Sequence, residues 1–268
     1  MIKITKDNTL IPNSLKIPNA EFFPMGNPPL VARTTHMRRV ELIENGAYVN
    51  HANYNSRYKV NDIKKALRDI YKGKCGFCEQ KIEQWHVEHY RPKDTYYWLA
   101  YSWNNLLVAC ATCNQFKGTN FDLDGTFQNF IDSPANRNGI NVLSETYDPI
   151  ELPRMVNPEV TNPNGNINFN KNGIISSNNR RFSYTIEKCK IDRKDLNDER
   201  RSLLDRFKEE VRSALLDHNN REDQLFEIAV LIKQFVRDSI NDKITFLAFR
   251  RYAISSNWLN EEVKILLN

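Results

Sequence analysis

Two pairs of cysteines with the same internal spacing are the clearest candidates for a metal-binding site in this sequence. Two residues separate Cys75 from Cys78 and Cys110 from Cys113, and 31 residues lie between the two pairs. A Cys-x-x-Cys turn directs two thiolates at one point, and two such turns supply the four soft ligands of a tetrahedral zinc site. Because simple zinc ribbons have only about 15–20 residues between the pairs, we expect a folded segment in this interval.

Redox-active cysteines and disulfides are the alternatives to a metal site. A reducing cytoplasm disfavours disulfides, and two matched pairs suit a metal better than they suit a single redox motif. Four protein ligands leave no open position on zinc, so this ion would hold the fold rather than react. The fifth cysteine, Cys189, has no partner in the sequence and is expected to be a small buried hydrophobic residue.

The segment between the pairs carries a second group of polar residues. Glu88 and His89 precede Pro92, Asn105 precedes two leucines, and Asn114 follows Cys113 directly. We expect a strand that carries Glu88 and His89, a second strand near residues 106–109, and a helix that starts at Cys110. Zinc would then hold both ends of a ββα unit together.

These residues, in this order, resemble the HNH endonuclease superfamily in its cysteine-bearing form. Glu88-His89 matches the first motif, Asn105 the second and Asn114 the third. The chain has Glu where Asp is commoner and Asn in a place where the family has His or Asn. The longer runs Val-Glu-His-Tyr-Arg-Pro-Lys and Cys-x-x-Cys-Asn-x-x-Lys-Gly are similar to PtuB-like HNH proteins of retron and Septu-type anti-phage systems, over roughly residues 60–205.

The resemblance implies metal-dependent hydrolysis of phosphodiester bonds. His89 would be the general base, because an imidazole can accept a proton from water near neutral pH. Glu88 and Asn114 offer oxygen ligands that suit a catalytic Mg²⁺ or Mn²⁺. Asn105 would constrain the loop that orients His89. Three basic residues are phosphate-contact candidates, although each could equally be an ordinary solvated charge: Arg91, Lys93 and Lys117.

The resemblance also implies partners. Family members of this type act beside a PtuA-like ATPase subunit, and some act with a reverse transcriptase and its non-coding RNA. The substrate would be a nucleic acid, either DNA or RNA, with tRNA among the RNAs considered. The competing hypothesis is a catalytically silent zinc module that binds nucleic acid or protein.

The rest of the chain predicts an α+β protein in which this unit is embedded among helices. We expect an N-terminal arm and helix over 1–60, available for a partner contact, and the HNH unit over 61–121. Loops and a β-hairpin at Asn172-Gly173 follow over 122–194, and a helical C-terminal lobe over 195–268. Its second helical stripe is expected to line the bundle core and comprises Leu225, Ile228, Ala229, Ile232, Phe235 and Val236.

Composition narrows the class further but does not name a substrate. The 268 residues carry a net charge of +5, which permits a polyanionic partner without requiring one. No apolar run is long enough to span a membrane. The first residues lack the apolar stretch of a signal peptide, so the expected location is cytoplasmic.

Overall fold

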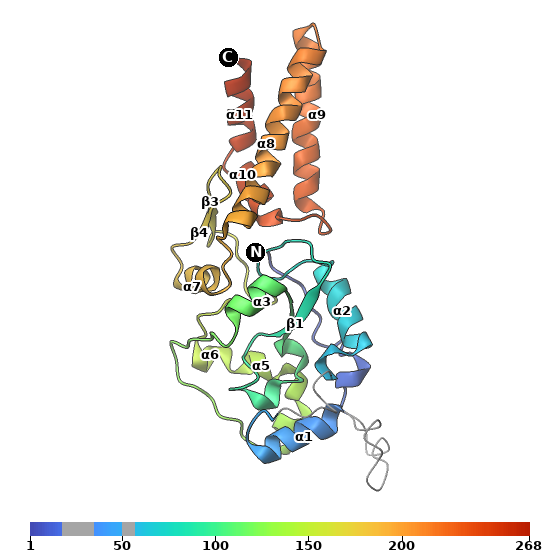
Figure 1. The fold of residues 1–268 in the computed structure, drawn as a ribbon, viewed down its shortest axis with the longest axis vertical. Helices are drawn as coiled ribbons and strands as arrows, with labels where there is room; N and C mark the ends of the chain where they lie inside the picture. Colours follow the sequence, from blue (N-terminus) through green and yellow to red (C-terminus); the bar gives the residue numbers. More distant parts are fainter. Residues whose placement is uncertain (18–34, 50–56) are drawn as a thin grey trace.

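A helical lobe extends from a more compact part that contains the ββα unit, and the molecule is elongated as a result (Figure 1). The computed structural model describes residues 1–17, 35–49 and 57–268. Part of the expected N-terminal arm and helix, residues 18–34 and 50–56, lies outside the described residues. Its first part packs on the body: Met1, Ile4 and Leu15 are buried, and Ile4 N donates a hydrogen bond to Pro158 O at 2.7 Å.

The helices α1 (Thr35–Asn45) and α2 (Asn61–Tyr71) precede the ββα unit. A single 3₁₀ turn, η4 (Arg57–Lys59), precedes α2. The buried face of α2 carries Ile63, Leu67 and Tyr71. The backbone then turns left-handed at Lys72 and Gly73, with φ values of 53° and 68°. This ends the helix immediately before the first cysteine pair.

The ββα unit has the expected elements. Strands β1 (Trp85–His89) and β2 (Leu106–Cys110) pair antiparallel, with Trp85 opposite Cys110 and His89 opposite Leu106. Helix α3 (Ala111–Lys117) follows β2 without a loop. The Cys110 thiol sulfur accepts a hydrogen bond from Cys113 N at 3.4 Å and so caps the first turn of the helix.

Short helices and a hairpin follow the unit. The helices α4 (Pro134–Asn138), α5 (Leu143–Thr146) and α6 (Asp148–Glu151) are no longer than five residues. The hairpin pairs β3 (Asn168–Phe169) with β4 (Ile175–Ser176), as expected. Gly173 has a φ of 79° in its turn, a conformation that glycine adopts without strain.

The C-terminal lobe consists of helices, as expected. They are α8 (Lys194–Asp217), α9 (Arg221–Ile240), α10 (Leu247–Ser255) and α11 (Trp258–Leu267). One more helix, α7 (Arg180–Lys188), follows the hairpin and precedes this lobe. None of the described helices is both long enough and apolar enough to cross a membrane.

The expectation for the apolar stripe of α9 is wrong in part. Ile228 and Phe235 are buried, but Leu225 and Val236 are 47% and 40% exposed. Ala229 is exposed as well. The reason is that α8 and α10 pack against one side of α9 only, and no described element covers the adjacent apolar side.

The aromatic residues between the cysteine pairs build the core, as the sequence favours. Five of them are at most 2% exposed: Tyr90, Tyr96, Trp98, Tyr101 and Trp103. The architecture is therefore the expected α+β type, with a small two-stranded unit inside a mainly helical protein.

Candidate active site and metal centre

The four paired cysteines converge on one point. The sulfur atoms of Cys75, Cys78, Cys110 and Cys113 all lie within 4.8 Å of one another, and all four residues are buried. Zinc–sulfur bonds of about 2.3 Å in a tetrahedron separate the sulfur atoms by about 3.8 Å. The Sγ atoms of Cys78 and Cys110 are 3.9 Å apart, so the donor set fits a metal ion such as zinc.

An arginine that the sequence did not single out lies against this cluster. Arg193, immediately before α8, directs Nη1 at Cys113 Sγ (3.6 Å) and Nη2 at Cys78 Sγ (4.0 Å). Four thiolates around a divalent ion carry a net negative charge, which a guanidinium offsets. Arg193 lies 80 residues from Cys113 along the chain, so no local spacing could have revealed this contact.

The ring of His89 is fixed in one tautomer. His89 is buried, and its Nε2 lies 2.8 Å from the carbonyl oxygen of Ala100. Because a carbonyl can only accept, Nε2 carries the hydrogen and Nδ1 keeps the lone pair in the neutral ring. Burial lowers the pKa of His89 to about 3, against the opposing effect of the Ala100 carbonyl. The imidazole is therefore in its basic, unprotonated form at neutral pH.

The carboxylate of Glu88 is also buried and already has a cation beside it. Lys117 Nζ lies 2.8 Å from Glu88 Oε1 and 2.8 Å from the carbonyl oxygen of His89. Burial raises the pKa of Glu88, and Lys117 opposes this shift. Lys117 is completely buried, which does not fit a direct phosphate contact. Instead it ties the end of α3 to the strand that carries Glu88 and His89.

Asn105 holds both ends of the loop between the two strands. Its Oδ1 accepts a hydrogen bond from Arg91 N at 2.8 Å. Its Nδ2 donates to Arg91 O at 3.1 Å and to Leu99 O at 3.2 Å. Leu99 immediately precedes Ala100, whose carbonyl receives the His89 ring. The contacts of Asn105 thus fix the backbone that orients His89.

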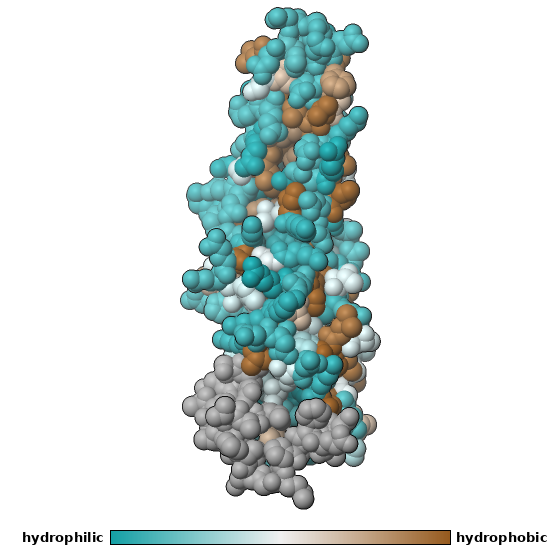
Figure 2. Space-filling model, turned by 90° about the vertical axis from the view of Figure 1, so that its right-hand side faces the viewer, coloured by the Kyte–Doolittle hydropathy of each residue, from teal (hydrophilic) through white to brown (hydrophobic). Residues whose placement is uncertain are grey.

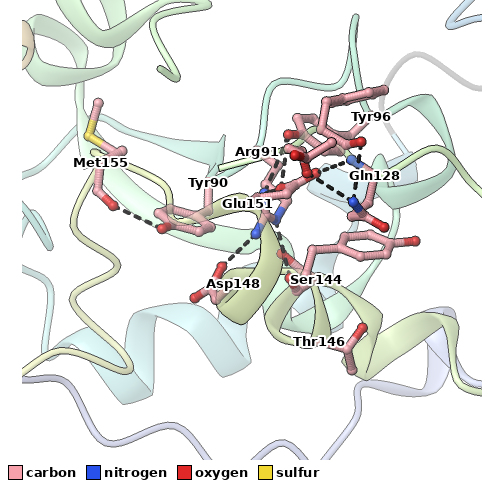
Figure 3. Close-up of polar contacts among 12 residues, drawn as sticks. Tyr90, Arg91, Tyr96, Gln128, Ser144, Thr146, Asp148, Glu151 and Met155 are labelled. Carbon is pink, nitrogen blue, oxygen red and sulfur yellow. Dashed lines mark hydrogen bonds and ion pairs between the residues drawn. The ribbon is translucent and has the colours of Figure 1, made fainter. Parts of the chain in front are cut away.

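Arg91 lies in a buried polar network rather than on a phosphate-binding surface. Its guanidinium donates hydrogen bonds to Glu151 and Asp148, and its Nε to Ser144 O at 3.2 Å (Figure 3). The Tyr96 hydroxyl donates to the same Glu151 carboxylate at 3.1 Å. Arg91 is fully buried, so the predicted phosphate contact does not fit its position. It fastens α5 and α6 to the loop that follows β1.

Lys93 is the one predicted phosphate contact with an accessible position. Its Nζ lies 3.6 Å from the centre of the Tyr48 ring and 3.7 Å from Asp94 Oδ1. Its side chain is 26% exposed. Lys93 and Lys59 both disfavour a positive charge on His89, which places two cations around the imidazole. Lys59 is exposed and was not among the predicted site residues.

Tyr58 is a further neighbour of His89 that the sequence did not indicate. The two ring centres are 4.8 Å apart and the rings meet edge to face, at 70°. Asn114, in contrast, was predicted from its motif position. It is half-buried and lies one helical turn before Lys117, so both residues occupy the same face of α3.

The comparisons with known proteins agree with this geometry. Residues 74–120 match the family model described as HNH endonuclease. That range contains both cysteine pairs, β1, β2 and α3, so fold, site and family model together define this segment as an HNH unit.

Two curated proteins are similar to parts of this chain. A protein from Bacillus mycoides (strain KBAB4) named Septu protein PtuB is 30% identical over 161 residues, which is 53% of this chain and 51% of that protein. Another Septu protein PtuB, from Bacillus thuringiensis, is 39% identical over 79 residues, or 28% of this chain and 31% of that protein. The predicted resemblance to PtuB-like HNH proteins is confirmed. The chain spans about half the length of the first of these curated relatives and about a third of the second. No solved structure gives a significant match.

Proposed function

We propose that this chain is a metal-dependent HNH endonuclease that hydrolyses phosphodiester bonds. The observation that carries the proposal is the fixed tautomer of His89. Its Nε2 is bound to the Ala100 carbonyl at 2.8 Å, which leaves Nδ1 as the basic atom inside a unit that matches the HNH family model. A neutral imidazole held in one orientation is what a general base requires.

In this mechanism His89 takes a proton from the attacking water at Nδ1. The positive charge that develops on the ring is stabilised through Nε2–H by the Ala100 carbonyl. Asn105 keeps that carbonyl in place through the hydrogen bonds that it makes at both ends of the loop. Lys93 and Lys59 would hold the phosphate, because they are the accessible cations near the ring.

Glu88 and Asn114 are the proposed ligands of one catalytic Mg²⁺ or Mn²⁺. Carboxylate and amide oxygens suit these hard cations. When bound, such an ion polarises the scissile phosphate and neutralises the departing 3′ oxygen. Lys117 lowers the pKa of Glu88 against the larger effect of burial, and it also occupies Glu88 Oε1. For the four-cysteine cluster we propose structural Zn²⁺.

The proposed biological role is that of a nuclease effector in anti-phage defence. Its support is the similarity to two proteins named Septu protein PtuB. By the same resemblance, the chain would act with an ATPase subunit, and a reverse transcriptase with its RNA is a further proposed partner. Copurification of the chain with the products of its neighbouring genes tests these partners.

The test of catalysis compares three forms of the purified chain on DNA and on RNA, with Mg²⁺, with Mn²⁺ and with a chelator. His89→Ala should lower cleavage by about a hundredfold or more, because general base catalysis contributes at least that much. His86→Ala is the matched control, since it makes the same change on the same strand. Each variant is checked for metal content and for its melting temperature.

Full activity in a folded His89→Ala protein would refute the proposed base. A catalytically silent zinc module is the second candidate, and the pairing of Glu88 with Lys117 favours it. That module would bind nucleic acid or protein without any cleavage that depends on Mg²⁺ or Mn²⁺. The chelator arm of the experiment therefore separates the two functions.

A further inference from the structure

Helix α9 exposes several large apolar residues on the side that faces away from the bundle. Figure 2 looks at the side of the molecule on which α9 lies, and hydrophobic residues are spread along its upper half. Five large apolar residues of α9 are between 40% and 71% exposed: Leu225, Phe226, Val230, Val236 and Ile240. Successive residues of a helix turn by about 100°, so these five fall within one arc of about 140° on one broad side of α9.

A further exposed apolar residue lies near the start of α9. Leu216, near the end of α8, is 82% exposed. The Gln224 side chain donates a hydrogen bond to Leu215 O at 2.9 Å, which brings this part of α8 next to the first turn of α9. Several large apolar residues gathered on one side of a helix, with charged residues among them, are typical of a binding surface.

The charged residues along this face have opposite signs in its two halves. Glu222 and Asp223 lie in the first turn of α9, whereas Lys233 and Arg237 lie in its second half. Among the described residues, no ion pair involves Lys233 or Arg237. Asp223, Val230 and Arg237 are spaced by seven residues, so they form one line along the helix with Val230 at its midpoint.

We propose that α9 pairs antiparallel with α9 of a second copy of this chain. A two-fold axis beside Val230 brings the two Val230 side chains together at the centre. It also places Asp223 of each copy against Arg237 of the other, which forms two ion pairs of the same kind. A parallel pair would instead align the acidic turns with each other, and the basic halves likewise.

The size of the face predicts a reversible dimer. A helix of 20 residues is about 30 Å long, and a face about 10 Å wide gives about 600 Å² buried in total by two copies. Stable interfaces bury about 1,200 Å² or more. The exposed Leu216 extends the face toward the partner's Ile240 but does not reach that range. Buried area does not fix an affinity, but an interface of this size predicts weak association, in the micromolar range.

Sedimentation velocity of the full chain at about 1–200 µM tests this proposal, because these concentrations cover dissociation constants in the micromolar range. Asp223→Arg alone and Arg237→Glu alone should each weaken the dimer by about tenfold or more, since two attractive pairs become repulsive. An equimolar mixture of the two variants restores both ion pairs in a mixed dimer and should sediment like the unaltered chain. Glu83→Arg changes an exposed charge elsewhere and is the control. Circular dichroism verifies that each variant is folded.

Weakening by each reversal alone, followed by recovery in the mixture, supports the antiparallel pairing. A parallel pair already opposes like charges at both positions, so neither reversal alone would weaken it. A chain that remains monomeric at the highest concentration overturns the proposal. A dimer that neither reversal weakens overturns it too, since another surface would then hold the copies together. Val230→Asp places two carboxylates at the axis and should abolish dimerisation, which gives a second test that does not depend on ion pairs.

Discussion

The buried pair of Lys117 and Glu88 gives a sharp energetic prediction. Lys117 is completely buried, Glu88 is 7% exposed, and their charged atoms are 2.8 Å apart. Lys117→Met removes the cation and leaves a buried carboxylate without compensation, a change that costs about 3–5 kcal/mol in free energy of unfolding. The carbonyl of His89 also loses a hydrogen bond from Nζ. Since domains are stable by about 5–15 kcal/mol, this change removes a large part of the total.

A double-mutant cycle isolates the charge effect. Glu88→Gln with Lys117→Met leaves no buried charge at this position, so the double variant should be more stable than Lys117→Met by about 2 kcal/mol or more. Urea denaturation at pH 7, followed by circular dichroism, measures all four proteins. If Lys117→Met costs less than about 1 kcal/mol, or if the double variant gains nothing over it, the pair does not stabilise the strand as argued.

The pH dependence has a definite sign in this cycle. Burial already raises the pKa of Glu88 above its ordinary value, and Lys117 is the largest opposing influence. Without Lys117 the pKa of Glu88 rises further. A raised pKa in the folded state means that stability is present below the unfolded pKa and is lost as pH rises through the folded one. The free energy of unfolding of Lys117→Met should therefore approach that of the double variant as the pH is lowered.

Three further predictions concern the metal centre, the loop and the base. Cys110→Ser should reduce metal content, measured by elemental analysis, from about one zinc per chain and lower the melting temperature; unchanged zinc would contradict the four-cysteine site. Asn105→Ala removes three hydrogen bonds to Arg91 and Leu99. The free energy of unfolding should therefore decrease by about 2–4 kcal/mol, and the cleavage rate should fall as well. Burial lowers the pKa of His89 to about 3. The stability that the neutral ring contributes is therefore present above the unfolded pKa and is lost as the pH falls. Between pH 7 and pH 5 the free energy of unfolding, measured in urea, should decrease by about 2 kcal/mol more in the unaltered chain than in His89→Gln.

The sequence was sufficient to predict the unit that contains the site. Four cysteines in two matched turns define both ends of the ββα unit, and the strands and α3 lie where the motif places them. Such local patterns are predictable because a turn, a strand and a following helix involve few residues. The contact of Arg193 with the thiolates was not predictable, because it depends on how α8 packs against the unit.

Charged residues and apolar spacing said less about which side chains are exposed, because exposure depends on how the elements pack. Arg91, Lys93 and Lys117 are the same kind of residue in the sequence, yet two of them are buried beside carboxylates. In α9, two adjacent stripes are apolar, and periodicity alone does not say which one faces the bundle. Ile228 and Phe235 are buried, whereas Leu225 and Val236 remain exposed.

The burial of two predicted phosphate contacts changes how the site would bind its substrate. Arg91 and Lys117 stabilise the unit, so among the described residues Lys93 and Lys59 are the accessible cations near His89. Two phosphate contacts release few counterions and give weak, mildly salt-dependent binding to nucleic acid. A nuclease unit with so few contacts gains selectivity when another protein brings the substrate to it. The charge distribution around His89 thus supports the proposal that a partner directs this chain, independently of its similarity to the Septu proteins.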